Sequence, residues 1–219
     1  MSSGPGPIES SLSESSLSES SISESSISES RLSESCLSSR LIHDEGFLRV
    51  RKDTVRLPNG STGTREVVEH PGATAVVALT DAGDVVVVQQ FRYALGQVFT
   101  EIPAGKLERN EQPLHCAQRE LREETGWIAH EWAWLARVHP AIGFSNEKIE
   151  IFLARGLTQG AATPDAEEFL EVDAWPVQRL LEAIRTGTLT DPKTIVGVLT
   201  VDRMQRGEWP WPEFEAAGG

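Results

Sequence analysis

The sequence has little positive charge: 20 lysines and arginines stand against 33 acidic residues, which leaves a net charge of −13 over 219 residues. Proteins that bind duplex nucleic acid neutralise phosphates with patches of lysine and arginine, so this imbalance argues against a nucleic-acid partner. There are only two cysteines, Cys36 and Cys116, in segments of very different composition, so we expect no disulfide and a reducing cytoplasm.

Other signals are missing as well. No apolar run approaches the ~20 residues that cross a bilayer, and the N-terminus lacks the regions of a secretory signal, so we expect a soluble cytoplasmic protein without membrane contact. No Gly-x4-Gly-Lys-Ser/Thr phosphate loop occurs. The histidines show no zinc spacing and are expected to be surface or loop residues: His43, His70, His115, His130 and His139.

Between Gly105 and Trp127, acids, an arginine and two glycines occur at offsets that ordinary helix patterning does not produce. The pattern is Gly-x5-Glu-x7-Arg-Glu-Leu-x-Glu-Glu-x-Gly-Trp. Its fixed positions are Gly105, Glu111, Arg119, Glu120, Leu121, Glu123, Glu124 and Gly126. The simpler interpretation is a solvated acidic helix face, which is what most glutamate runs are. The flanking glycines and Glu111 at their fixed offsets argue against it.

Elementary chemistry predicts that this segment forms a helix and binds a divalent cation. Pro113 suits a first helical turn and Gly126 suits a helix end, which predicts a helix of about 13 residues. Glu120, Glu123 and Glu124 share one face of it, because positions three and four apart are neighbours. Their mutual repulsion favours a hard divalent cation, Mg²⁺ first and Mn²⁺ second. The apolar residues fall on another face, which should pack on a sheet: Leu114, Ala117 and Leu121.

The pattern resembles the Nudix box, with Trp127 in place of the usual final aliphatic residue. Further segments are similar to the ADP-ribose pyrophosphatase branch of the Nudix hydrolases, and together they extend the resemblance over about residues 46–200. They are His70-Pro71-Gly72-Ala73, Gln89-Gln90-Phe91-Arg92, Glu101-Ile102-Pro103-Ala104-Gly105, Gly143-Phe144-Ser145-Asn146-Glu147 and Asp191-Pro192-Lys193-Thr194.

The resemblance assigns roles around the metal. It implies that the Ala104 carbonyl and the carboxylates of Glu120 and Glu124 bind Mg²⁺, with Glu123 ligating a further ion. Arg119 and Glu111 would support these ligands as a buried pair. Gly105 would permit the backbone turn that aims the Ala104 carbonyl, and Gly126 would end the helix.

The resemblance also implies a general base on a mobile loop after the box. We expect Glu168 in that role, with Glu167 as the second candidate; the competing interpretation is that both are solvated loop acids. Arg92 is the expected protein contact to the diphosphate, and Glu101 and Glu147 are further candidates for substrate contact. Family members exchange N-terminal strands between subunits, so a homodimer is expected.

Apolar periodicity gives the organisation of the chain. Strands are expected over 46–56, 64–69, 72–79, 85–90, 131–138, 148–154 and 169–173, with helices over 177–186 and 191–204. The segments 81–84 and 58–60 read as turns, the first of them within a hairpin. The predicted fold class is an α/β/α sandwich of the Nudix type with a mixed sheet and a small N-terminal β subdomain.

The predicted domains are a tail over 1–41, a β segment for dimerisation and the base pocket over 42–69, a Nudix domain over 70–206 and a C-terminal tail over 207–219. The N-terminal tail repeats five-residue units such as Ser-Leu-Ser-Glu-Ser, which are expected to be disordered because they bury little apolar surface. A pentapeptide-repeat β-helix and a phosphorylatable or partner-binding tail are competing interpretations of the same repeats.

The predicted function is Mg²⁺-dependent hydrolysis of the diphosphate of ADP-ribose to AMP and ribose 5-phosphate. The family's marker proline, about 15 or 16 residues past the box, is absent, since Ile142 and Gly143 occupy that region. GDP-mannose, NADH or another nucleoside diphosphate sugar therefore stays open as the substrate. Two functions without catalysis also stay open: an ADP-ribose-sensing regulator, and an interaction protein that works through the serine-rich tail.

Overall fold

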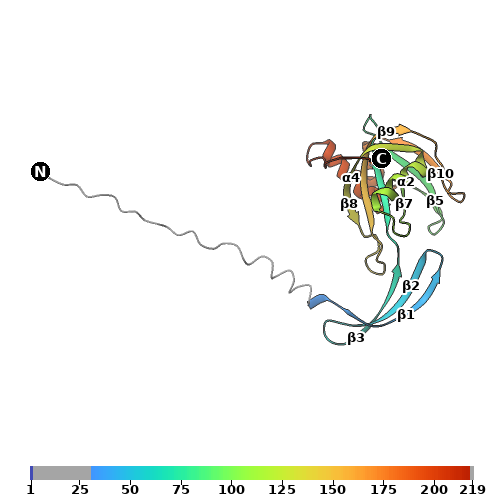
Figure 1. Ribbon diagram of the computed structural model, residues 1–219, viewed down its shortest axis with the longest axis vertical. Helices are drawn as coiled ribbons and strands as arrows, with labels where there is room; N and C mark the ends of the chain where they lie inside the picture. The colour runs from blue at the N-terminus through green and yellow to red at the C-terminus, as the bar shows by residue number, and fades with distance from the viewer. Residues whose placement is uncertain (2–30, 218–219) are drawn as a thin grey trace. The chain divides into compact units, whose positions relative to one another are not determined.

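The computed structural model describes Met1 and residues 31–217 (Figure 1). By chain contacts it divides into two units, residues 1–39 with 53–65 and residues 40–52 with 66–219. In the part of the chain that is described, no helix is both long and apolar enough to cross a membrane.

The strands β1 (Ser35–Glu45), β2 (Leu48–Arg56) and β3 (Thr62–Glu69) form one sheet in that order. The expected strands and the turn at 58–60 are therefore confirmed, but β1 begins at Ser35, inside the segment expected to be a tail up to residue 41. Every residue of β1 is exposed, so the strand depends on backbone pairing rather than apolar burial, and composition gave no sign of it. Most of the repeats lie outside the described residues.

Two further sheets build the second unit. One has the order β10-β5-β6, from β5 (Val85–Arg92), β6 (Gln97–Glu101) and β10 (Leu170–Trp175). The other has the order β11-β8-β9-β4-β7, from β4 (Ala73–Ala78), β7 (Ala104–Lys106), β8 (Trp127–Val138), β9 (Ile149–Gln159) and β11 (Glu215–Ala216). The β4–β9 pair is parallel and the other pairs of these two sheets are antiparallel, so the mixed sheet is confirmed.

The expected hairpin at 81–84 is only partly correct. The turn forms, because the Thr80 amide donates to the Asp84 carbonyl and one bridge joins Leu79 to Val85. Beyond that bridge β4 and β5 enter different sheets. All of β4 and the first half of β5 are buried, which suits strands covered on both faces rather than a half-exposed hairpin.

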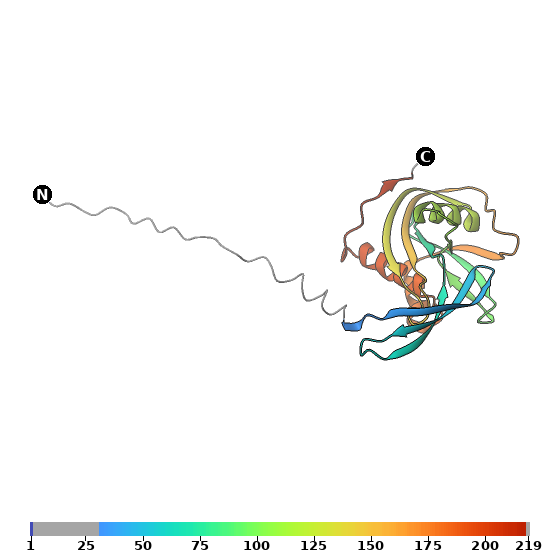
Figure 2. The same ribbon diagram turned by 60° about the horizontal axis from the view of Figure 1, so that its bottom comes forward.

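The helices are α2 (Pro113–Thr125), α3 (Val177–Thr186) and α4 (Pro192–Gln205). They match the expected segments to within a residue, and α2 has the 13 residues expected of it. Alternate residues of β4 point to opposite faces. Val76 and Ala78 pack with Leu121 of α2, whereas Ala75 and Val77 pack with Val198 of α4. Figure 2 shows β8 and β9 between α2 in green and α4 in red.

Candidate active site

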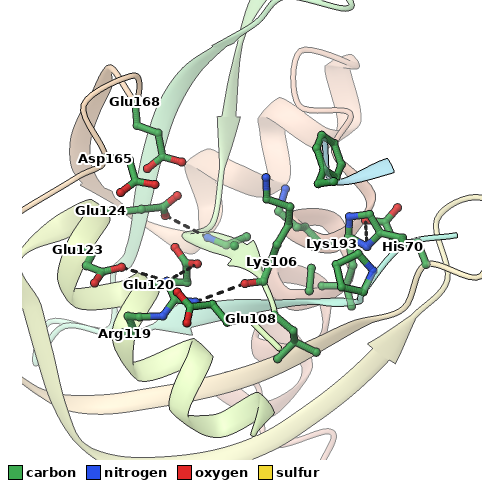
Figure 3. A pocket seen from close by; sticks show the side chains of 18 of the residues that line it. His70, Lys106, Glu108, Arg119, Glu120, Glu123, Glu124, Asp165, Glu168 and Lys193 are labelled. Carbon is green, nitrogen blue, oxygen red and sulfur yellow. Dashed lines mark hydrogen bonds and ion pairs between the residues drawn. The ribbon is translucent and has the colours of Figure 1, made fainter. Parts of the chain in front are cut away.

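A cavity of about 780 Å³ lies over the N-terminal end of the box and the C-terminal half of α2 (Figure 3). Acidic side chains of α2 and of the loop after β9 line one part of it, and basic side chains line another. The charged lining residues are Arg92, Lys106, Glu108, Arg119, Glu120, Glu123, Glu124, Glu147, Asp165, Glu168 and Lys193.

Gly105 lies in β7, where it pairs with Thr74 of β4. A Cβ atom built at Gly105 would fall 1.9 Å from the carboxyl carbon of Glu120. Its φ is not among the positive values of the chain, so a left-handed turn is not what requires glycine here. The expected reason was therefore wrong: Gly105 is needed because the Glu120 carboxylate packs directly against its backbone.

Two carboxylates of α2 are buried beside this strand. Glu120 is 9% exposed and Glu124 is 4% exposed. The Ala104 amide donates to Glu124 Oε2 at 3.0 Å, which ties β7 to the helix. Burial and the charge of Glu120 raise the pKa of Glu124 to about 8, against the smaller effect of that hydrogen bond. Burial also raises the pKa of Glu120, although Arg119 opposes it.

Arg119 connects three carboxylates of the site through hydrogen bonds. It donates to Glu111 through Nε at 2.9 Å and through Nη2 at 3.0 Å, which forms the pair that the resemblance implies as a two-pronged contact. Its Nη1 donates to Glu120 at 2.8 Å and to Glu123 at 3.0 Å. The hydrogen bonds from Arg119 hold the pKa of Glu111 at about 2, well below its usual range.

The end of α2 anchors the loop that follows β9. Gly126 caps the helix with a φ of +74°, as expected, and its amide donates to the Arg122 carbonyl. The Gly160 amide donates to the Gly126 carbonyl at 2.7 Å, and the Thr163 amide donates to the Glu123 carbonyl at 2.9 Å. A Cβ at position 126 would lie 2.9 Å from backbone atoms of Gly160 and Ala162, so the loop requires glycine there too.

That loop brings Asp165 and Glu168 to the cavity, where Figure 3 shows both above Glu124. The Glu168 amide donates to the Asp165 carbonyl at 2.9 Å, which closes a turn between them. The charge of Glu168 acts on both Glu120 and Glu124. Glu167 is exposed and does not line the cavity. Sequence reasoning placed the loop but missed Asp165, which only the turn brings inward.

Arg92 lines the cavity, but Glu101 does not. Glu101 is 4% exposed and accepts hydrogen bonds from Arg92 Nε at 2.7 Å and from Arg92 Nη2 at 2.8 Å. It also receives Lys193 Nζ at 2.5 Å. The structure therefore places Glu101 behind Arg92 as a support, in place of the expected contact with substrate.

The far part of the cavity holds Glu147 and His70, with His70 Nδ1 3.7 Å from Glu147 Oε1. Phe47 meets the His70 ring edge-on at 6.0 Å, and Lys106 Nζ lies 4.3 Å over the Phe47 ring. His70 lies in the loop between β3 and β4, as expected, and its side chain lines the cavity. His70 belongs to one of the segments that carry the resemblance and Lys106 lies inside the box, but the sequence assigned neither residue a role in the site.

Glu120, Glu123 and Glu124 suit a divalent cation by their chemistry. Two of them are buried, and a cation would offset the repulsion that raises the pKa of Glu124. Within residues 31–217, however, no three His, Cys, Asp or Glu side chains are already gathered closely enough to hold a metal ion. Arg119 instead binds two of the carboxylates. The oxygen donors of the site therefore suit a divalent cation, but they are not arranged around one point as a complete set of ligands.

Known protein families and proteins match most of this chain. Residues 69–195 match the NUDIX domain, and residues 34–68 match the nucleoside diphosphate sugar hydrolase N-terminal domain. The chain is 40% identical over 153 residues to a methanol dehydrogenase activator of Bacillus methanolicus, covering 69% of this chain and 83% of that protein. It is 39% identical over 148 residues to an ADP-ribose pyrophosphatase of Bacillus subtilis, covering 67% and 80% respectively.

Among solved structures, an ADP compounds hydrolase superposes with a TM-score of 0.68 over 81% of this chain and 97% of that chain, at 19% identity. That likeness supports the fold. The two domain matches cover the described strands and helices from β1 to the start of α4. The chain therefore belongs to the Nudix hydrolase family, with the N-terminal domain of its nucleoside diphosphate sugar hydrolases.

Proposed function

We propose that the protein hydrolyses ADP-ribose to AMP and ribose 5-phosphate with the help of Mg²⁺. The observation that carries the proposal is one cavity in which buried carboxylates of α2 face Glu168 of the loop and Arg92 of β5. The similarity to an ADP-ribose pyrophosphatase over most of both chains supports the substrate.

The chain's residues divide the reaction between them. Arg92 presents a positive guanidinium to the diphosphate. Glu168 accepts a proton from the water whose oxygen forms a bond to one phosphorus, while the bridging P–O bond breaks and its electrons leave with the departing phosphate. The loop position of Glu168 allows the base to approach only when substrate is bound.

Glu120, Glu123, Glu124 and the Ala104 carbonyl would hold the divalent ion. When bound, Mg²⁺ neutralises charge on the phosphoryl oxygens and lowers the pKa of water. Arg119 and Glu111 hold two of these carboxylates in place from behind. Mn²⁺ is the expected substitute, because it accepts the same oxygen ligands.

The test is a panel of ADP-ribose, GDP-mannose and NADH, each incubated with Mg²⁺, with Mn²⁺ and with EDTA, and resolved by HPLC. We expect equal amounts of AMP and ribose 5-phosphate from ADP-ribose with Mg²⁺, and no products with EDTA. Preference for another compound would move the proposal to that nucleoside diphosphate. Failure to cut any of them would overturn the hydrolase and favour a sensing role.

We also propose that the protein is a cytoplasmic homodimer, since the resemblance implies that its N-terminal strands are exchanged between subunits. Light scattering after gel filtration should give about twice the 24.0 kDa chain mass. A mass equal to one chain across the micromolar range would contradict the dimer and leave the hydrolase proposal unaffected.

A further inference from the structure

Lys193 is a buried ammonium that the proposed reaction does not use. It lies in the first turn of α4 and lines the cavity, yet its side chain is only 8% exposed. Its Nζ lies 2.5 Å from Glu101 Oε2 and 3.0 Å from Asp191 Oδ1. Both partners are carboxylates, so the charge is fully compensated.

Such an arrangement is costly if its only purpose is stability. Removing an ammonium and a carboxylate from water carries a desolvation cost that their attraction often fails to recover. Apolar side chains in place of the whole ion-paired group would fill the same volume without that cost. The ion pairs therefore point to a task that an apolar side chain would not perform.

The geometry around Glu101 suggests that task. Its Oε1 accepts Arg92 Nε at 2.7 Å, and its Oε2 accepts both Arg92 Nη2 at 2.8 Å and Lys193 Nζ at 2.5 Å. Burial raises the pKa of Glu101, but the hydrogen bonds from Arg92 and the charge of Lys193 outweigh it and leave the pKa below its usual range. Lys193 thus helps keep Glu101 ionised and in the position where it accepts the hydrogen bonds from Arg92.

The start of α4 is itself fixed against the strand that carries Glu101. Asp191 caps the helix by accepting from the Thr194 amide at 3.0 Å. Thr194 Oγ1 accepts from the Ile102 amide at 2.9 Å, and Ile102 directly follows Glu101. Lys193 is therefore held between two anchored neighbours, whereas the Arg92 side chain is 43% exposed and depends on Glu101 for its orientation.

We propose that Lys193 is a positioning residue for Arg92: through Glu101 it fixes the guanidinium that meets the diphosphate. The inference rests on the proposed function for the identity of the anion. It differs from a purely structural role, which would change stability alone, and from direct contact of Lys193 with phosphate, which would not depend on Arg92.

The first test reads the Arg92 side chain without substrate. In protein labelled with ¹⁵N-arginine, the Arg92 Nε–Hε signal is assigned by its loss in Arg92→Lys. We expect exchange of that hydrogen with solvent to accelerate about 10-fold or more in Lys193→Met, and to stay slow in Lys193→Arg. Lys52→Met, which removes a surface lysine paired with Glu66, is the matched control and should leave the signal unchanged.

The second test reads binding and turnover. Lys193→Met should lower kcat/KM for ADP-ribose by about 100-fold, since misplacing a positioning contact by about 1 Å costs that much. In an Arg92→Ala background the same change should cost less than about 3-fold. Effects that multiply fully, or an unchanged Arg92 signal in folded Lys193→Met, would overturn the proposal.

Two further arms keep the outcomes separate. Lys193→Met leaves the Asp191 carboxylate without its lysine partner, and this could prevent folding. In that case the double variant Lys193→Met, Asp191→Asn removes the carboxylate charge and keeps a side chain that can cap α4. Asp191→Asn alone is the reference for the double variant. If the wild-type protein cuts no diphosphate compound, the proposed function fails. The Arg92 signal, and the affinity for inorganic pyrophosphate with Mg²⁺ measured by calorimetry, then still decide the role of Lys193.

Discussion

Glu124 is a carboxylate with 4% exposure that repels Glu120 and receives a single backbone hydrogen bond. Glu124→Gln keeps the shape and the acceptor for the Ala104 amide but removes the charge a cation would bind. We expect kcat to fall by about 10³-fold, and the metal-free protein to be at least as stable as wild type. Glu171→Gln, at an exposed position of β10, should change neither quantity. Unchanged turnover in Glu124→Gln would remove the metal site from the mechanism.

A substitution at Gly105 should affect metal binding and activity without affecting the stability of the fold. The carboxylate that a new Cβ would strike is the far end of a flexible side chain, so Gly105→Ala should move Glu120 and leave the strand in place. We expect weaker Mg²⁺ binding by calorimetry and a loss of activity of about 10- to 100-fold. The melting temperature should change little. Gly143→Ala, where the new Cβ meets nothing within 4 Å, is the control.

Glu111 gives the site a pH dependence that can be isolated. Its pKa is lowered to about 2 in the fold, so its contribution to stability is present above the ordinary pKa of about 4.5 and is lost as pH falls through about 2. Glu111→Gln should lower the free energy of unfolding by about 1.5–3 kcal/mol at pH 7, the range for hydrogen bonds to charged groups. Urea unfolding at pH 7 and pH 3 should show this difference shrinking at the lower pH. A constant difference would contradict the ion pair with Arg119.

At the scale of elements, α4 packs on β4 through a glycine. A Cβ at Gly197 would lie 2.6 Å from Cγ2 of buried Val77, and neither group has room to yield. Gly197→Ala should therefore destabilise the protein by about 1–3 kcal/mol, although alanine favours helix by up to about 1 kcal/mol. Leu199→Ala, on the exposed face of α4, should cost about 0.5 kcal/mol or less in the same denaturant titration. An equal cost for the two would show that the α4–β4 contact is looser than described.

The same elements show what the sequence could reveal. The ends of α2 were readable from Pro113 and Gly126, because each residue has a strong local preference. β1 was missed because all of its residues are exposed, and β7 because three residues are too few for any period. Asp165 was missed because its position depends on a turn held by contacts with α2, which no local pattern encodes.

For the molecule as a whole, the sequence leaves open whether the serine repeats matter for turnover. All the residues assigned to metal, base and diphosphate lie between Arg92 and Lys193. Deleting residues 2–30 should therefore leave kcat and KM within about twofold of wild type, since the deletion removes none of these assigned residues. A large loss of activity in the shortened chain would contradict this and show that the tail contributes to turnover.

The C-terminal end of α2 holds the loop at Gly160 and Thr163, shortly before Asp165 and Glu168. The other residues of the loop can vary in sequence while these tethers keep Asp165 and Glu168 in position beside the carboxylates of α2. A change of substrate could then come from substitutions at those other loop positions, while the residues that carry out hydrolysis stay the same. Natural variation among relatives should accordingly concentrate at the remaining loop positions and avoid the tethers, Asp165 and Glu168.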